Sequence, residues 1–135
     1  MAYLDNTDFT LLVQDVNLQQ IINSNAAILD QAVNVATGEA RSYLVQKYRF
    51  DDELLLAGNA RDPQLVNYIC DITLYHLHSR ISPRNIPELR VTRYENAIHW
   101  LKMCAMGDAT PKLLEYETPK TAVRWGSQPK NTNSY

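Results

Sequence analysis

The chain has 135 residues, 45% of them hydrophobic, and a formal net charge of −2. This length suits a single domain, the hydrophobic content excludes a chain that is disordered throughout, and the nearly balanced charge gives no global argument for nucleic-acid binding. No apolar run approaches the ~20 residues that span a bilayer, and the first residues lack the features of a signal peptide. We therefore expect a protein that is made in the cytoplasm and has no membrane partner.

Charge is distributed unevenly along the chain. Residues 1–40 contain acidic side chains and no Lys or Arg, residues 80–102 are mainly basic, and Lys120, Arg124 and Lys130 are the only charged residues from position 118 onward. Two interpretations stay open. The charges either belong to solvated helix faces, or they let an acidic face of one copy meet a basic face or tail of another.

The first predicted helix is short. Asn6, Thr7 and Asp8 precede the apolar residues 9–13 in the manner of a helix cap. We expect residues 15–17 to break this helix, which leaves room for one further turn over residues 18–22.

A second, longer helix is predicted over residues 26–47, which at ~1.5 Å per residue is ~30 Å long. Its predicted apolar side consists of Ile28, Ala32, Val35, Ala36, Ala40, Tyr43 and Leu44. Gly38 lies in the middle, where glycine costs about 1 kcal/mol relative to alanine. We expect a close approach of another helix to explain it.

The third predicted helix follows a loop over residues 48–62, in which the acidic residues 51–53 form a loop or a single turn and are expected to be solvated. Asp62 and Pro63 are typical of a helix start. The helix extends to about Ser79, and two neighbouring apolar stripes make it the predicted central helix of a bundle. The stripes are Leu65, Ile69, Ile72 and His76, and Val66, Cys70, Thr73 and Leu77.

The fourth predicted helix begins after the proline-containing loop at residues 82–87 and ends at Gly107. Its predicted apolar side consists of Leu89, Tyr94, Ala97, Ile98, Leu101, Cys104 and Ala105. Helical periodicity does not return afterwards. The predicted fold is all-α: a helical body of about four helices over residues 1–107, and an extended C-terminal arm over residues 108–135.

The chain offers little that would support catalysis. His76 and His78 are two positions apart and point in different directions on a helix, and we expect His99 and Cys104 to be packing residues. Cys70 is likewise expected to be a buried thiol. No nucleophile signature, metal-ligand spacing or phosphate-binding glycine loop is present, so we predict no enzyme activity, cofactor or metal. The proline-containing loop at residues 82–87 is too long for a helix-turn-helix motif.

The arm is the predicted partner-binding region. Residues 121–125 favour a short β-strand, and a tryptophan is costly to leave in water. The side chains expected to contact a partner are Lys120, Val123, Arg124, Trp125, Lys130 and Tyr135. The basic members are also compatible with a nearby DNA backbone, without sequence recognition.

Several segments resemble the head–tail connector proteins of tailed bacteriophages, also called adaptor or head-completion proteins. These segments are residues 3–5, the helix that ends in residues 42–48, the Pro63-led helix, and residues 93–101 followed by Gly107. The resemblance covers about residues 1–107. The residues that carry its motifs are Tyr43, Lys47, Tyr48, Arg93, Tyr94 and Gly107, with Lys47 where the family pattern has arginine.

The resemblance implies a small helical bundle that forms a ring, typically of twelve copies, below the portal at the capsid vertex. Such a ring extends the DNA channel, completes the head and presents a surface to the next neck or tail component. The implied partners are further copies of the chain, the portal and a downstream neck or tail protein. Two alternatives stay open: a small helical DNA-binding or regulatory protein, and a non-virion interaction module such as a chaperone or antitoxin-like protein.

Overall fold

The computed structural model describes residues 3–115, and within this range it contains five α-helices, two 3-10 turns and no strand. The elements are η1 (Asn6–Phe9), α1 (Asp15–Ile21), α2 (Ala26–Leu44), α3 (Phe50–Glu53), η2 (Gly58–Ala60), α4 (Pro63–Ile81) and α5 (Glu88–Met106). The predicted small all-α bundle is confirmed. The possible arm strand at residues 121–125 lies outside the described residues.

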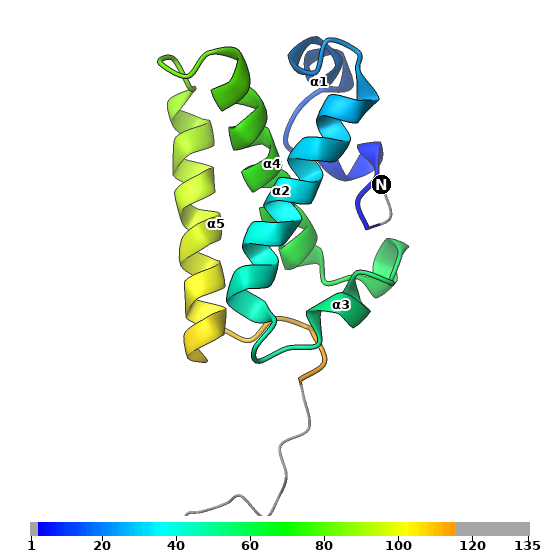
Figure 1. The fold of residues 1–135 in the computed structure, drawn as a ribbon, viewed down its shortest axis with the longest axis vertical. Helices are drawn as coiled ribbons and strands as arrows, with labels where there is room; N and C mark the ends of the chain where they lie inside the picture. The colour runs from blue at the N-terminus through cyan, green and yellow to red at the C-terminus, as the bar shows by residue number, and fades with distance from the viewer. Residues whose placement is uncertain (1–2, 116–135) are drawn as a thin grey trace, which may run out of the picture.

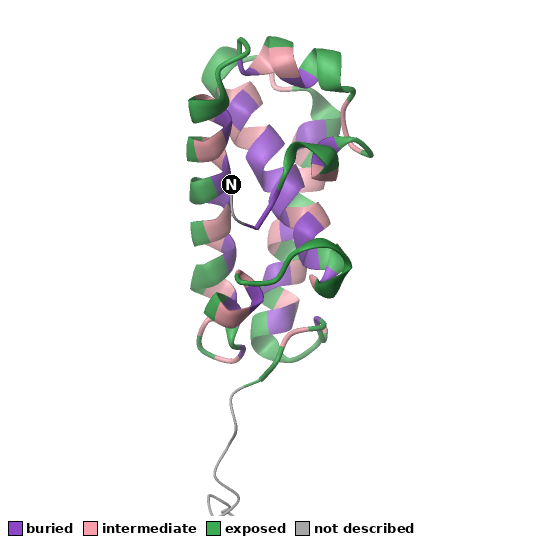
Figure 2. Ribbon diagram, turned by 90° about the vertical axis from the view of Figure 1, so that its right-hand side faces the viewer, coloured by how far each residue is buried: buried purple, intermediate pink, exposed green. Residues whose placement is uncertain are grey.

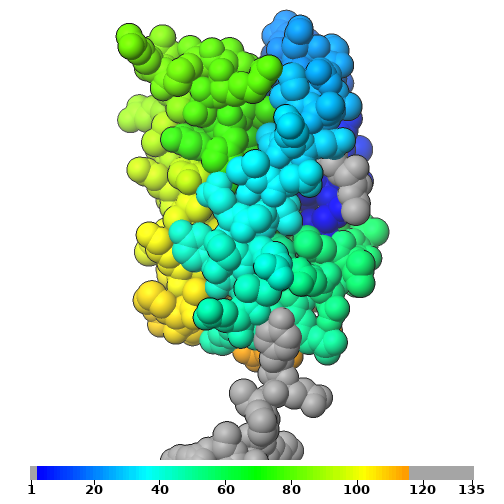
Figure 3. Space-filling model, in the orientation of Figure 1, coloured from blue at the N-terminus to red at the C-terminus, as the bar shows by residue number. Residues whose placement is uncertain are grey.

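Three long helices, α2, α4 and α5, pack along the long axis of the molecule (Figure 1). α4 contacts both of the others and runs in the opposite direction to them. α1 and the loop of residues 82–87 lie at one end, which we call the upper end; α3 and residues 107–115 lie at the other, which we call the base. Figure 3 shows α2 and α5 next to each other on one face.

α4 is the central helix, as its two apolar stripes predict. Its buried residues include both stripes except His76, and Figure 2 shows how the buried surfaces of the long helices face inward. Asp62 caps the helix by accepting a hydrogen bond from the Gln64 N–H at 3.1 Å, and Pro63 occupies the first turn. Both cysteines are buried and free.

The N-terminal segment differs from the prediction. Residues 6–9 form only a 3-10 turn, and Asp15 begins α1, so the expectation that residues 15–17 break a helix was wrong. An acidic side chain in the first turn is favourable because it faces the positive end of the helix dipole. Leu18 and Ile22 then bury themselves in the core.

The apolar face of α2 is rotated from the predicted one. Leu29 and Val33 are buried, whereas Val35 is exposed. Gly38 is also exposed, and a Cβ at this position would meet nothing within 4 Å, so the predicted close helix approach was wrong. α2 contacts both α4 and α5, and these contacts, which the sequence of α2 alone does not specify, decide which of its residues are buried.

α5 ends where predicted, because Gly107 adopts a left-handed conformation with φ of 87°. Leu89 and Ala105, which were predicted on the apolar side, are exposed, so this part of the prediction was wrong. His99 is exposed as well, and its predicted packing role was wrong. Cys104 is buried, as expected.

Residues 48–62 contain one helical turn, α3, and a buried carboxylate. Glu53 belongs to the acidic triplet that we expected to be solvated, but it accepts hydrogen bonds from the Tyr3 hydroxyl at 2.5 Å and from the Asp62 N–H at 2.8 Å. Tyr3 lies 50 positions from Glu53 along the chain, and Asp62 lies 9 positions from it. A local sequence pattern does not reveal them.

Residues 108–115 return to the base of the bundle. The Lys112 N–H donates to Asp62 Oδ2 at 3.1 Å, and the Arg49 N–H donates to the Leu114 carbonyl at 2.7 Å. Tyr48 and Glu115 form an isolated antiparallel bridge. The beginning of the predicted arm, residues 108–115, is therefore held against the base of the helices.

Candidate assembly site

Three of the motif residues meet at the base. Lys47 Nζ lies 5.7 Å from the centroid of the Tyr48 ring, and it lies 3.0 Å from the position that a Cβ on Gly107 would occupy. Tyr48 is buried and pairs with Glu115. The end of α2, the end of α5 and the returning segment are thus joined at one place.

Two further motif residues lie in an aromatic cluster between the long helices. The Tyr94 ring stacks on Tyr75 with centroids 4.1 Å apart, and its hydroxyl donates to Glu39 Oε2 at 3.3 Å. His76 Nε2 contacts the other oxygen of the same carboxylate. Burial, followed by the nearby Glu39 charge, raises the pKa of Tyr94 to about 12. Tyr43 packs against the core beside this cluster.

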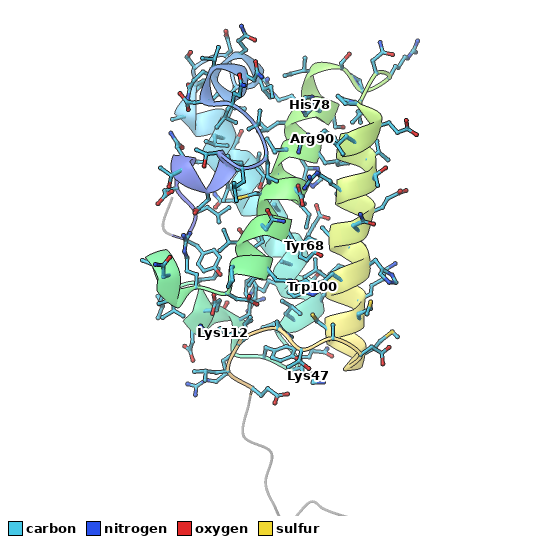
Figure 4. All side chains as sticks on the ribbon, turned by 180° about the vertical axis from the view of Figure 1, so that it is seen from behind. Lys47, Tyr68, His78, Arg90, Trp100 and Lys112 are labelled. Carbon is cyan, nitrogen blue, oxygen red and sulfur yellow. The ribbon has the colours of Figure 1, made fainter. Side chains whose placement is uncertain are left out.

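Tyr68 and Trp100 form a second aromatic contact, between α4 and α5. Their ring centroids are 4.9 Å apart, and both side chains are half-buried. Figure 4 shows the two labelled residues at mid-height, with His78 and Arg90 above them and Lys47 and Lys112 at the base. This pair gives the α4–α5 side a partly exposed aromatic surface.

The sixth motif residue, Arg93, belongs to a buried charge cluster that sequence reasoning missed. Asp71 Oδ1 lies 3.8 Å from Arg93 Nη1 and 3.9 Å from Arg90 Nη1, while Arg90 Nη2 donates to the Leu12 carbonyl at 2.8 Å. Asp71 is 2% exposed and Arg90 8%. Asp71 Oδ1 and Arg90 Nη1 make no hydrogen bond with any described residue.

Burial has the largest effect on the pKa values of the side chains in this cluster. It raises the pKa of Asp71 to about 6, although Arg93 and Arg90 act in the opposite direction. Burial also lowers the pKa of Arg90, and burial and then the Arg90 charge lower the pKa of His78. The only sequence signal was the position of Asp71 between the two apolar stripes of α4.

A second buried network fixes the N-terminus. Arg61 donates to both oxygens of Asp8, at 2.7 and 2.9 Å, and to the Tyr3 carbonyl at 2.7 Å. The Tyr3 hydroxyl bonds to Glu53, and burial followed by that hydrogen bond raises the pKa of Tyr3. Asp8 is therefore neutralised within the chain, and it does not contribute to a free acidic face.

The described residues include no cluster of three or more His, Cys, Asp or Glu side chains that could hold a metal ion. Burial raises the pKa of Cys104 to about 11 and that of Cys70 further still, so both thiols stay protonated at neutral pH. Within residues 3–115, no helix has the length and apolar character that crossing a membrane requires.

An apolar groove at the base has a volume of about 770 Å³. One wall carries Leu55 and Leu56, and the other carries Leu113 and Leu114. Leu55 is 83% exposed, Leu56 38% and Leu114 67%. Arg49, Asp52, Glu53 and Lys112 also line it. We call this hollow the base groove.

The upper end has a different hollow, of about 520 Å³, between α1 and the start of α5. Val13 and Ile21 line it on the α1 side, and the exposed Ile81 and Leu89 line it on the other. We call it the upper groove. The two ends of the long axis thus present two different apolar hollows.

The arm residues predicted to bind a partner, Lys120, Val123, Arg124, Trp125, Lys130 and Tyr135, lie outside the described residues. Their roles stay predictions. The base groove was missed, because Leu54, Leu55 and Leu56 indicated only an apolar run in a loop. Its second wall comes from residues 112–114, more than fifty positions later.

The model of a protein family described as Bacteriophage Mu, Gp36 matches residues 3–126, which includes every described residue. No curated protein and no solved structure matches the chain.

Proposed function

Since the chain belongs to the bacteriophage Mu Gp36 family, we propose that it is a structural virion protein of the phage neck. It forms a ring between the portal and the tail components, extends the DNA channel and completes the head. It is not an enzyme. Its place is the capsid vertex, which it reaches after synthesis in the host cytoplasm.

The observation that carries the proposal is the presence of unlike apolar grooves at the two ends of the bundle. A ring that sits between two other components needs one contact surface toward each of them. A monomeric protein gains nothing from leaving Leu55, Leu114, Ile81 and Leu89 in water. We assign the upper end of the bundle to one of these components and the base to the other.

The sides of the bundle supply the contacts around the ring. Neighbouring copies in a ring meet through two different surfaces that close after a full turn. The α2–α5 face and the α4–α5 side with Tyr68 and Trp100 are the two surfaces that we assign to these contacts. Contact between the channel wall and DNA is non-specific, because the net charge of −2 disfavours tight binding of a polyanion.

The charge cluster argues against the DNA-binding alternative. Arg90 belongs to the mainly basic segment at residues 80–102, but its guanidinium is buried beside Asp71 and donates to the Leu12 carbonyl. It is not available to a phosphate without local unfolding. Lys102 is exposed near the end of α5, whereas the exposed Arg80 and Arg84 lie at the end of α4 and in the loop that follows it. These separated residues do not make one duplex-binding surface.

The proposal is tested by co-expressing the full chain with the portal protein of the phage or prophage that encodes it, followed by size-exclusion chromatography and negative-stain electron microscopy. We expect the chain to co-elute with the portal and to appear as an additional ring at one end of it. A chain that elutes as a monomer, separate from an intact portal, contradicts the proposal.

A further inference from the structure

We infer that the base groove of each copy receives residues 122–126 of a neighbouring copy, with Trp125 filling it. This inference rests on the proposed ring and identifies the surface on which the arm docks. The predicted partner of the arm thereby becomes a second copy of this chain rather than the portal.

The base groove is preformed. Its second wall is fixed by two hydrogen bonds: the Arg49 N–H donates to the Leu114 carbonyl at 2.7 Å, and the Lys112 N–H donates to the Asp62 side chain at Oδ2 at 3.1 Å. The buried Glu53 supports the first wall through its hydrogen bond to the Asp62 N–H. A segment that binds in the groove therefore meets an existing hollow, and binding does not have to include the entropic cost of ordering the groove walls.

The chemistry of the base groove suits a large apolar side chain with a basic neighbour. Leu55, Leu56 and Leu114 provide an exposed apolar centre. Arg49 Nε and Asp52 Oδ2 form an ion pair at 2.7 Å on the rim, with both side chains about half exposed. An apolar centre with a polar rim is typical of protein interfaces, and tryptophan is enriched among the residues that dominate them.

The arm has the matching sequence and begins at the right place. The described chain ends at Glu115, one residue after Leu114 of the groove wall. In an extended segment, Val123 and Trp125 would lie on one side and Arg124 on the other, because side chains alternate. Val123 and Trp125 then enter the groove, and Arg124 lies at the rim near the Asp52 carboxylate.

A neighbouring copy is a better source of the arm than the same copy. Groove and arm are two unlike surfaces, and a contact between unlike surfaces repeats around a ring until it closes. The groove and Glu115, the last described residue before the arm, both lie at the base, so copies in the same orientation bring the two to the same level (Figure 1). An arm bound in its own groove would contribute nothing to the contact between copies.

The test is a disulfide cross-link between two differently tagged copies in the portal-bound assembly. One copy carries Leu55→Cys and the other Gly126→Cys; both native thiols are buried, which keeps background reaction low. The matched control replaces Leu55→Cys with Val35→Cys, an exposed position on α2 that lines a different hollow. We expect at least tenfold more cross-linked heterodimer with Leu55→Cys than with the control.

The outcomes separate this inference from the proposed function. A ring that assembles without the Leu55–Gly126 cross-link overturns the groove inference and leaves the ring intact. A chain carrying both substitutions that cross-links only to itself also overturns it. Cross-linking between copies that never form a ring supports the groove contact and contradicts the neck ring, and the absence of both ring and cross-link contradicts both.

Discussion

Lys47 and Gly107 are direct neighbours at the base of the bundle, although sixty positions separate them. The Lys47 Nζ lies 3.0 Å from where a Cβ on Gly107 would be, and Gly107 has a φ of 87°. The end of α2 therefore packs on the end of α5 at a position that favours glycine for two reasons. The left-handed backbone conformation is costly for other residues, and a Cβ at this position would lie very close to the Lys47 ammonium group.

Replacing Gly107 with alanine tests this relationship. We expect Gly107→Ala to lower the free energy of unfolding by about 1–2 kcal/mol, because a left-handed conformation is costly for a residue with a Cβ. The Lys47 side chain must also move. Chemical denaturation measures the change.

Gly38→Ala is the matched control in the same protein. Gly38 lies in the middle of α2, exposed, with nothing within 4 Å of an added Cβ. We expect this change to raise the free energy of unfolding by about 0.5–1 kcal/mol, because alanine is the better helix former. If both variants changed stability in the same direction, the account of the two glycines would be wrong.

Asp71 should give the protein a distinctive pH dependence. Its pKa in the folded state is about 6, above the ordinary value of 3.8, so between these values the folded state holds a proton that the unfolded state has lost. Stability contributed by this group is therefore present at low pH and is lost as pH rises through about 6. The loss amounts to at most about 3 kcal/mol.

The measurement is urea unfolding of the wild type and Asp71→Asn at several pH values from 4.5 to 7. Asparagine keeps the shape of the side chain and cannot ionise. We expect the free energy of unfolding of the wild type to fall relative to that of Asp71→Asn across this range. Parallel curves for the two proteins would show that Asp71 is not held in an environment that disfavours its charge.

Tyr94 should contribute to stability mainly through its ring. We expect Tyr94→Ala to cost about 2 kcal/mol, less than for a fully buried aromatic residue, because the side chain is half-buried. Tyr94→Phe keeps the stacking on Tyr75 and removes only the 3.3 Å hydrogen bond to Glu39, so it should cost less than about 1 kcal/mol. Thermal unfolding by circular dichroism compares the two variants, and equal losses would place the main contribution in the hydroxyl.

Trp125 should matter for assembly and not for the fold. We expect Trp125→Ala to weaken ring assembly at least tenfold while the unfolding midpoint of the free chain stays within experimental error. Leu55→Ser should reproduce this separation, and Leu11→Ser is its control, because Leu11 is 92% exposed and lies outside the base groove. If Trp125→Ala reduced stability and assembly equally, Trp125 would be part of the core.

Local signals predicted the parts of the fold that depend on neighbouring residues in the chain. Asp62 and Pro63 marked the start of α4, Gly107 marked the end of α5, and the two apolar stripes identified α4 as the central helix. Each of these signals depends only on residues a few positions apart in the sequence. The helical class of the fold followed from them.

The features that were missed depend on contacts between distant segments. Glu53 is buried because Tyr3 and Asp62 donate to it, and Asp71 is buried because Arg90 and Arg93 face it from α5. The base groove needs Leu114 to return beside the end of α3. Gly38 was misjudged for the same reason, since the face of α2 that packs on α4 was not fixed by its own sequence.

The most direct test of the neck-ring proposal is electron cryomicroscopy of intact particles from the phage or prophage that encodes this chain. The account predicts a ring of this chain between the portal and the tail, with each bundle fitting the density and an arm seated in the base groove of the adjacent copy. Particles whose neck is complete without this chain would contradict the account.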